Sequence, residues 1–244
     1  MKNIMALATG ALATLTVSGA LAGCTPTTEK AYTGPAVSPT IWTGSPAPAH
    51  GSGHGGHGQA SDAAADAPQA GADLNQYIMD NKIAEVPFKK DEPGTPKIDF
   101  PFPPDWVSAG DQTPDWAYGA IVYSKPQDPN DQPFIYAIGS KLTGDVDANK
   151  ILDLASGQLD ELPGFKSDGP PERGTFDGND SVTYTGTYTW EGKPRAVGQQ
   201  TIVVPGKDGL FVLQLNGEAP ADQEQVVIDA ATIIREKTKI TVPS

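Results

Sequence analysis

Apolar residues recur at helical spacing in three stretches of this chain, and each stretch predicts an amphipathic helix. The first follows Asp73, a suitable N-cap, and ends near Asn81. The second spans 147–162 and stops at Pro163-Gly164, and the third spans 222–237. The apolar positions of the three are Leu74, Tyr77, Ile78 and Met79; Ile151, Leu154, Ala155, Leu159 and Leu162; and Val226, Val227, Ala230, Ile233 and Ile234.

Alternation of apolar and polar residues predicts strands elsewhere. The clearest case is 181–190, where Val182 and aromatic residues alternate with Ser and Thr, which indicates one buried face and one outward hydroxyl face. Turns at 191–193 and 206–209 lead in meander order into two further strands, at 195–204 and 210–216.

Two earlier strands are predicted at 116–123 and 134–142. We expect Trp116, Tyr118, Ala120 and Val122 on one face of the first, and Phe134, Tyr136 and Ile138 together on the second. Prolines interrupt the region before these two strands, so we interpret 100–106 as an extended edge strand or a loop. Hairpins grouped together with helices between and after them indicate an α+β fold, an antiparallel sheet covered by helices.

The beginning of the chain has the pattern of a bacterial lipoprotein signal. One positive charge at Lys2 precedes an apolar segment, which ends in the lipobox Leu21-Ala22-Gly23-Cys24. We therefore expect a signal peptide over 1–23 and lipid attachment at Cys24, so that acyl chains hold the protein at the outer face of the plasma membrane, with part of it secreted. Cys24 is the only cysteine, so neither a disulfide nor a catalytic thiol is expected.

Residues 24–72 are rich in Pro, Ala, Thr, Ser and Gly and predict a disordered tether, which leaves 73–244 as one globular domain. The tether holds all three histidines of the chain, His50, His54 and His57. Imidazoles at such spacing are a candidate transition-metal site, but glycines do not pre-organise ligands, so a linker that carries histidine is the simpler interpretation.

Charge and residue types narrow the functional classes. The formal net charge of −13 argues against binding to nucleic acid. A domain without histidine lacks the usual general base, and no cofactor-binding motif is evident.

The segments 128–131 and 177–180 resemble parts of calcium loops but are interpreted as turns. Carboxylate pairs at Asp145 and Asp147, or Asp160 and Glu161, are the remaining acid–base candidates, although helix caps explain such residues more simply.

Aromatic residues give the positive signal. Rings at strand ends line clefts that bind sugars and acyl chains, although most rings in a small domain only fill its core. The candidate ligand-binding residues are Trp106, Trp116, Tyr118, Phe134 and Tyr136, and the two tryptophans are expected at the mouth of a site because prolines and aspartates flank them.

Several long motifs resemble the mycobacterial LpqN/LpqT lipoprotein family. They are Phe100-Pro-Phe-Pro-Pro-Asp-Trp106, the segment 114–123, Ser140-Lys-Leu-Thr-Gly-Asp-Val146 and the segment 204–216. The resemblance covers about 74–242 together with the lipobox. It implies a PsbP-like α/β/α sandwich, a place in cell-envelope lipid biology, and MmpL-type lipid exporters and glycolipids as partners.

Together these observations favour a non-catalytic, membrane-anchored protein that binds a glycolipid or acylated sugar and assists envelope lipid transport. The alternative is an interaction module that docks another protein without a small-molecule ligand. A hydrolase is the third hypothesis.

Overall fold

The computed structural model describes residues 74–243, and everything below concerns this part of the chain. The signal segment, Cys24, the tether and its histidines lie outside it, so the expectations for them stay predictions. The elements in chain order are α1 Leu74–Asp80, β1 Ala84–Phe88, β2 Lys97–Asp99, β3 Trp106–Ser108, η1 Gly110–Gln112, β4 Gly119–Tyr123, β5 Phe134–Thr143, α2 Ala148–Leu154, α3 Gly157–Asp160, β6 Lys166–Ser167, β7 Glu172–Phe176, β8 Asn179–Trp190, β9 Lys193–Gly206, β10 Gly209–Pro220, η2 Ala221–Gln223, α4 Glu224–Lys237 and β11 Lys239–Thr241.

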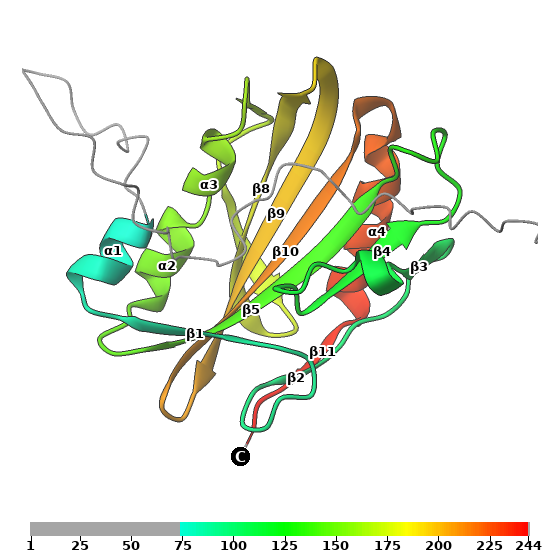
Figure 1. Ribbon diagram of the computed structural model, residues 1–244. Helices are drawn as coiled ribbons and strands as arrows, with labels where there is room; N and C mark the ends of the chain where they lie inside the picture. The colour runs from blue at the N-terminus through cyan, green and yellow to red at the C-terminus, as the bar shows by residue number, and fades with distance from the viewer. Residues whose placement is uncertain (1–73, 244) are drawn as a thin grey trace, which may run out of the picture. The chain divides into compact units, whose positions relative to one another are not determined.

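Nine of the strands form one antiparallel sheet, in the order β3-β4-β5-β10-β9-β8-β6, with β1 added beside β5 and β7 beside β8. The helices α1, α2 and α3 lie on one face of this sheet, here called the front face, and α4 lies on the other, the rear face (Figure 1). This arrangement confirms the α+β prediction and the α/β/α layering that the resemblance implies. None of the described helices is long and apolar enough to cross a bilayer.

The long hairpins follow from their turns. Asp177-Gly178 and Glu191-Gly192 are two-residue loops in which both residues have positive φ, the geometry that matches the twist of paired strands. The loop at 128–131 is also a turn, in which the Asn130 N–H donates to Asp128 Oδ1 at 2.9 Å. The interpretation of 128–131 and 177–180 as turns is thereby confirmed.

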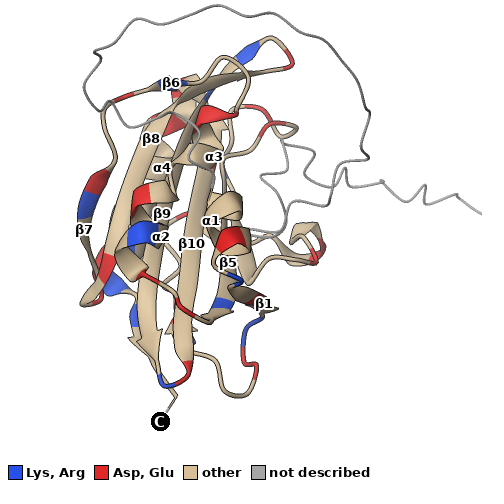
Figure 2. Ribbon diagram, turned by 90° about the vertical axis from the view of Figure 1, so that its left-hand side faces the viewer, with Lys and Arg blue, Asp and Glu red and all other residues tan. Residues whose placement is uncertain are grey.

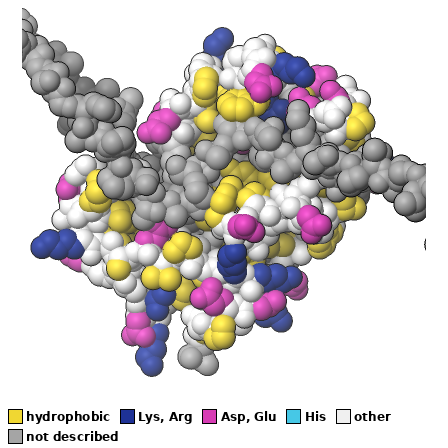
Figure 3. All heavy atoms as spheres, viewed as in Figure 1, with side chains coloured by type: hydrophobic (Ala, Val, Ile, Leu, Met, Phe, Trp, Pro, Cys, Tyr) yellow, Lys and Arg dark blue, Asp and Glu magenta, His cyan; other side chains and the backbone are white. Residues whose placement is uncertain are grey.

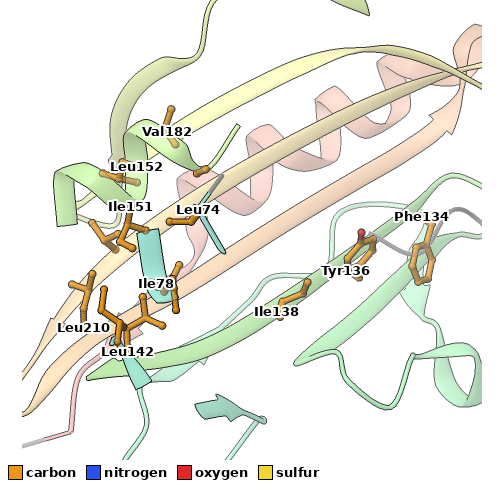
Figure 4. Packing of buried hydrophobic residues seen from close by; sticks show 14 of the residues in the cluster. Leu74, Ile78, Phe134, Tyr136, Ile138, Leu142, Ile151, Leu152, Val182 and Leu210 are labelled. Atoms are coloured by element: carbon orange, nitrogen blue, oxygen red, sulfur yellow. The ribbon is translucent and has the colours of Figure 1, made fainter. Parts of the chain in front are cut away.

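The core has two main layers. On the front face, α1 and α2 cover an aliphatic group from four strands, and Figure 4 shows Leu74, Ile78, Ile151 and Leu152 above these strands. On the rear face, α4 packs Ala230 and Ile234 against the sheet, with Val226 and Val227 beside them. Gly217 allows this close approach, because a Cβ there would lie 2.6 Å from Val227 Cγ1. Each fully buried aliphatic side chain contributes about 1.5–3 kcal/mol.

The predicted helix at 147–162 is two helices. Asp147 caps α2, accepting from the Asn149 N–H at 2.8 Å, which confirms the capping explanation for this carboxylate. Helix α2 ends at Leu154, and Gln199 Nε2 donates to the Ala155 carbonyl at 2.7 Å. Gly157 disfavours an unbroken helix here, because glycine costs about 1 kcal/mol in a helix interior. Leu159, in the separate α3, is still fully buried.

Strand β1 places a carboxylate in a partly buried position beside β5. The Ser140 hydroxyl donates to Glu85 Oε1 at 2.6 Å, whereas Glu85 Oε2 is buried and makes no hydrogen bond within the described part. Burial raises the pKa of Glu85 from 4.5 to about 7, and the bond from Ser140 opposes part of this rise.

This pKa predicts a pH dependence of stability. Between pH 4.5 and 7 the folded state binds more protons at Glu85 than the unfolded state, so the free energy of unfolding falls as pH rises through this window. We expect Glu85→Gln to remove this fall and to be more stable than the parent at pH 8 by about 1–2 kcal/mol. Urea unfolding of both proteins at pH 5 and pH 8 measures the difference, and a constant difference between the two pH values would contradict the assignment.

Candidate functional site

The front face changes character along its strands. Beneath α1 and α2 it is aliphatic, with Val212 of β10 opposite Val203 of β9 and Leu210 two residues before Val212. Farther along the same two strands it becomes polar, although the side chains stay at most 3% exposed. We call this polar group the amide cluster; it consists of Gln199, Thr201, Gln214 and Asn216.

The strand register places two members of the cluster in one row across four strands. Asn216 of β10 pairs with Gln199 of β9, and this pair lies between Tyr136 of β5 and Tyr184 of β8. Directly paired residues have their Cβ atoms about 4.5–5.5 Å apart, so the two amides are immediate neighbours with a phenol on each side.

Hydrogen bonds satisfy the amide cluster only in part. Asn216 Nδ2 donates to Gln214 Oε1 at 3.3 Å, and Gln214 Nε2 donates to Gln158 Oε1 of α3 at 3.0 Å. Two carbonyl oxygens, Gln199 Oε1 and Asn216 Oδ1, are buried and have no partner in the described structure. A buried acceptor without a partner costs about 1–3 kcal/mol, so these two atoms are suited to accept from a ligand.

Three aromatic residues border the amide cluster. Tyr136 contacts the Trp116 ring edge-on, with centroids 5.4 Å apart, and the Phe134 ring at 5.7 Å. Figure 4 shows Phe134 and Tyr136 at one end of β5, apart from the aliphatic group beneath α1 and α2. Trp116 is only half-buried, and Figure 3 shows a group of hydrophobic side chains near the middle of this face.

A buried ion network lies beside the amide cluster on the same face, farther along β8, β9 and β10. The Tyr188 hydroxyl donates to Glu218 Oε2 at 2.7 Å, and Arg195 Nε lies 3.8 Å from the same oxygen. Arg195 also pairs with Asp131 through Nη1. Burial, with the nearby Glu218 charge, raises the pKa of both Tyr136 and Tyr188 above the usual value of 10. Both phenols therefore remain protonated hydroxyls at neutral pH.

This arrangement offers recognition chemistry. Amide carbonyls, amide N–H groups and phenols bind hydroxyl groups, and aromatic rings contact the apolar face of a sugar. The remaining carboxylate candidate, Asp160, accepts a bond from the Tyr184 hydroxyl at 2.9 Å. Among the described residues no three His, Cys, Asp or Glu side chains are grouped to hold a metal ion.

Of the five aromatic residues singled out from the sequence, the structure brings together Trp116, Phe134 and Tyr136. The expected face of Tyr118 is wrong. Strand β4 begins only at Gly119, so Tyr118 lies before the alternation starts, and its ring packs against Phe88 on the rear side. Contact of these residues with a ligand stays a prediction.

The expected position of Trp106 at a mouth is also wrong. Its side chain is 5% exposed, because β3 places it in the rear core against Tyr123, with ring centroids 5.8 Å apart. Pro104 and Asp105 lie at the surface, but Pro103 and the indole itself do not.

The sequence-based predictions do not include the amide cluster. Its polar residues alternate with apolar ones such as Ile202 and Leu213, and this pattern predicts that the polar residues face the solvent. One signal could have found it. A two-residue loop at Lys207-Asp208 fixes the register of the predicted hairpin, and this register pairs Asn216 with Gln199.

The ion network gives a testable contrast in stability. Arg195→Met removes the cation and leaves Glu218 and Asp131 without it in a buried setting, for which we expect a loss of about 3–5 kcal/mol in the free energy of unfolding. Arg173→Met is the matched control, because the Arg173–Asp153 pair is half-exposed and should contribute about 0–1 kcal/mol. Urea denaturation checks both variants, and equal losses would show that Arg195 has no special role.

Acidic and basic residues are interspersed along the chain on the side of the molecule that carries α1, α2 and β7, as the ribbon colours of Figure 2 show.

Comparison with known proteins identifies the family. The family described as "Probable lipoprotein LpqN" matches residues 71–241. Lipoprotein LpqN of Mycobacterium tuberculosis (strain ATCC 25618 / H37Rv) is 45% identical over 170 residues, which make up 69% of this chain and 73% of that protein. The crystal structure of LpqN involved in cell envelope biogenesis of Mycobacterium tuberculosis has a TM-score of 0.66 at 44% identity, covering 70% of this chain and 98% of that one. These matches confirm the resemblance carried by the sequence motifs: the chain belongs to the LpqN lipoprotein family.

Proposed function

We propose that this protein is a non-catalytic lipoprotein of the cell envelope that binds an acylated sugar on its front face and assists envelope lipid transport. Its relative LpqN from Mycobacterium tuberculosis is described as involved in cell envelope biogenesis, which supports the place of action. The lipobox at Cys24 supports attachment to the outer face of the plasma membrane.

The pair of unpartnered carbonyl oxygens, Gln199 Oε1 and Asn216 Oδ1, carries the proposal. A sugar presents several hydroxyl donors on one ring, so it can satisfy both acceptors at once. The Trp116 and Tyr136 rings next to them provide apolar contact for the ring face or for the first part of an acyl chain.

Residue chemistry supports binding rather than turnover. The three histidines and the one cysteine of the chain all precede residue 74, so the described domain offers neither an imidazole base nor a thiol nucleophile. Glu218, the carboxylate closest to the amide cluster along β10, accepts from Tyr188 and lies beside Arg195. Its carboxylate is therefore already engaged by two side chains of the domain.

The proposed role in envelope lipid transport implies a partner protein in the membrane. An anchored protein that binds the polar part of a lipid can receive it from, or pass it to, a membrane exporter of the MmpL type. The family resemblance supports this choice of partner.

Binding is tested with the full chain carrying Cys24→Ser, which cannot be acylated. We expect saturable binding of trehalose monolaurate in isothermal titration calorimetry. Gln199→Leu and Asn216→Leu should each weaken it by about tenfold, equivalent to about 1.4 kcal/mol, and Trp116→Ala should weaken it as well.

Gln200→Leu is the matched control. Gln200 neighbours Gln199 on β9 but faces the rear side, so this variant should bind as the parent does. If the parent shows no saturable binding, or if the Gln199 and Gln200 variants behave alike, the sugar site is refuted. Capture of an exporter or another envelope protein by cross-linking without any lipid would then favour the interaction module.

A further inference from the structure

A cavity opens on the rear side of the sheet, and Tyr136, which borders the amide cluster, is also among the residues that line it. Its volume is about 500 Å³, within the range of small-molecule sites. Its walls come from β4, β5, β10 and α4, and the chain after β2 lies over it. The apolar side chains that line it are Ile98, Phe100, Ile121, Ile135, Leu215 and Ile234.

The rear cavity is a cleft that is partly open to solvent. Here Phe100, Ile121 and Leu215 remain only partly buried, although they belong to the rear core. The cavity therefore leaves apolar surface in contact with water, and an apolar occupant would remove that contact.

The roof of the rear cavity is the segment 97–102. Its first part, β2, is paired with β11 in a separate two-stranded sheet, and the Phe100 ring meets the Tyr118 ring edge-on at 6.1 Å. Phe102 follows at the rim and is 62% exposed, one of the most exposed large apolar side chains in the described part. An exposed aromatic side chain at the rim of an apolar cavity is placed to cover a bound chain.

The mouth carries charges of both signs. Lys90, Lys97, Asp91 and Asp99 line it, and all four are exposed. None of them forms an ion pair within the described residues. Because the two lysines and the two aspartates balance in charge, the mouth is complementary to a zwitterionic end group of a ligand rather than to a purely anionic or cationic one. Burial raises the pKa of Tyr118, so its hydroxyl at the inner wall stays neutral.

We infer that the rear cavity is a second binding site, which takes a single acyl chain whose zwitterionic end group remains at the mouth. This inference goes beyond the sugar site on the front face. Tyr136 of β5 is the residue that both sites share, whereas Gln199 and Asn216 do not line the rear cavity.

The test uses dodecylphosphocholine below its critical micelle concentration with the full chain carrying Cys24→Ser. We expect saturable binding at one site in calorimetry, and no binding of phosphocholine alone, because the apolar body supplies the affinity. Hydrogen exchange of the backbone amides in 97–102 should slow when the ligand binds.

Two variants test whether the ligand binds in the rear cavity. Ile121→Trp fills the cavity with a larger side chain. Phe102→Asp alters only an exposed side chain, so this variant still tests the inference if Ile121→Trp does not fold. Each should weaken binding by about tenfold or more. Met79→Asp is the matched control, since Met79 is 64% exposed on α1, and it should bind like the parent.

The inference fails if the parent does not bind dodecylphosphocholine saturably, or if Phe102→Asp and Met79→Asp behave alike. It also fails if Gln199→Leu abolishes this binding, because the chain would then lie on the front face. Binding that survives Gln199→Leu and is lost in Phe102→Asp supports it, whatever the outcome with trehalose monolaurate.

Discussion

The antiparallel pairing of β9 with β10 is the constraint on which the rest of the structure depends. It extends from Gly206 and Gly209 to Arg195 and Pro220 without a break in register. Side chains alternate between the two faces, so a shift by one residue would exchange the amide cluster with the apolar side chains that α4 covers. The same pairing therefore determines the polar patch in front and the apolar surface behind, and both candidate sites derive from it.

Burial of the amide cluster has an energetic cost that the neighbouring regions offset. Unpartnered acceptors at Gln199 and Asn216 are unfavourable, and the ion network around Glu218 contributes little net stability, because desolvation of its charges opposes their attraction. The aliphatic groups beneath α1 and α2, and those beneath α4, supply the stabilisation instead. On the front face, the chain thus separates the stabilising aliphatic region from the polar amide cluster.

The sequence predicts the long elements well, because strong periodicity and recognisable turns agree in β8, β9, β10, α1 and α4. The short strands escape prediction for physical reasons. Strand β1 contains Pro87 and lies at an edge, and β7 is exposed at four of its five positions, so neither shows a period of two. Trp116, Phe134 and Tyr136 are predictable as a group, whereas Tyr118 requires knowledge of where β4 begins. The burial of Gln199 and Asn216 depends on what lies across the strands, which no local pattern contains.

The C-terminal ribbon depends on a residue far away in the chain. Asp177, in the turn between β7 and β8, accepts from the Ile240 N–H at 2.7 Å and pairs with Lys239 at 2.9 Å. Strand β11 in turn positions β2, which is the first part of the segment 97–102 that forms the roof of the rear cavity. The shape of that opening is consequently governed by a carboxylate that does not line it. Two relatives with the same cavity walls but different residues at this turn would admit different molecules, and a comparison restricted to the lining would not reveal why.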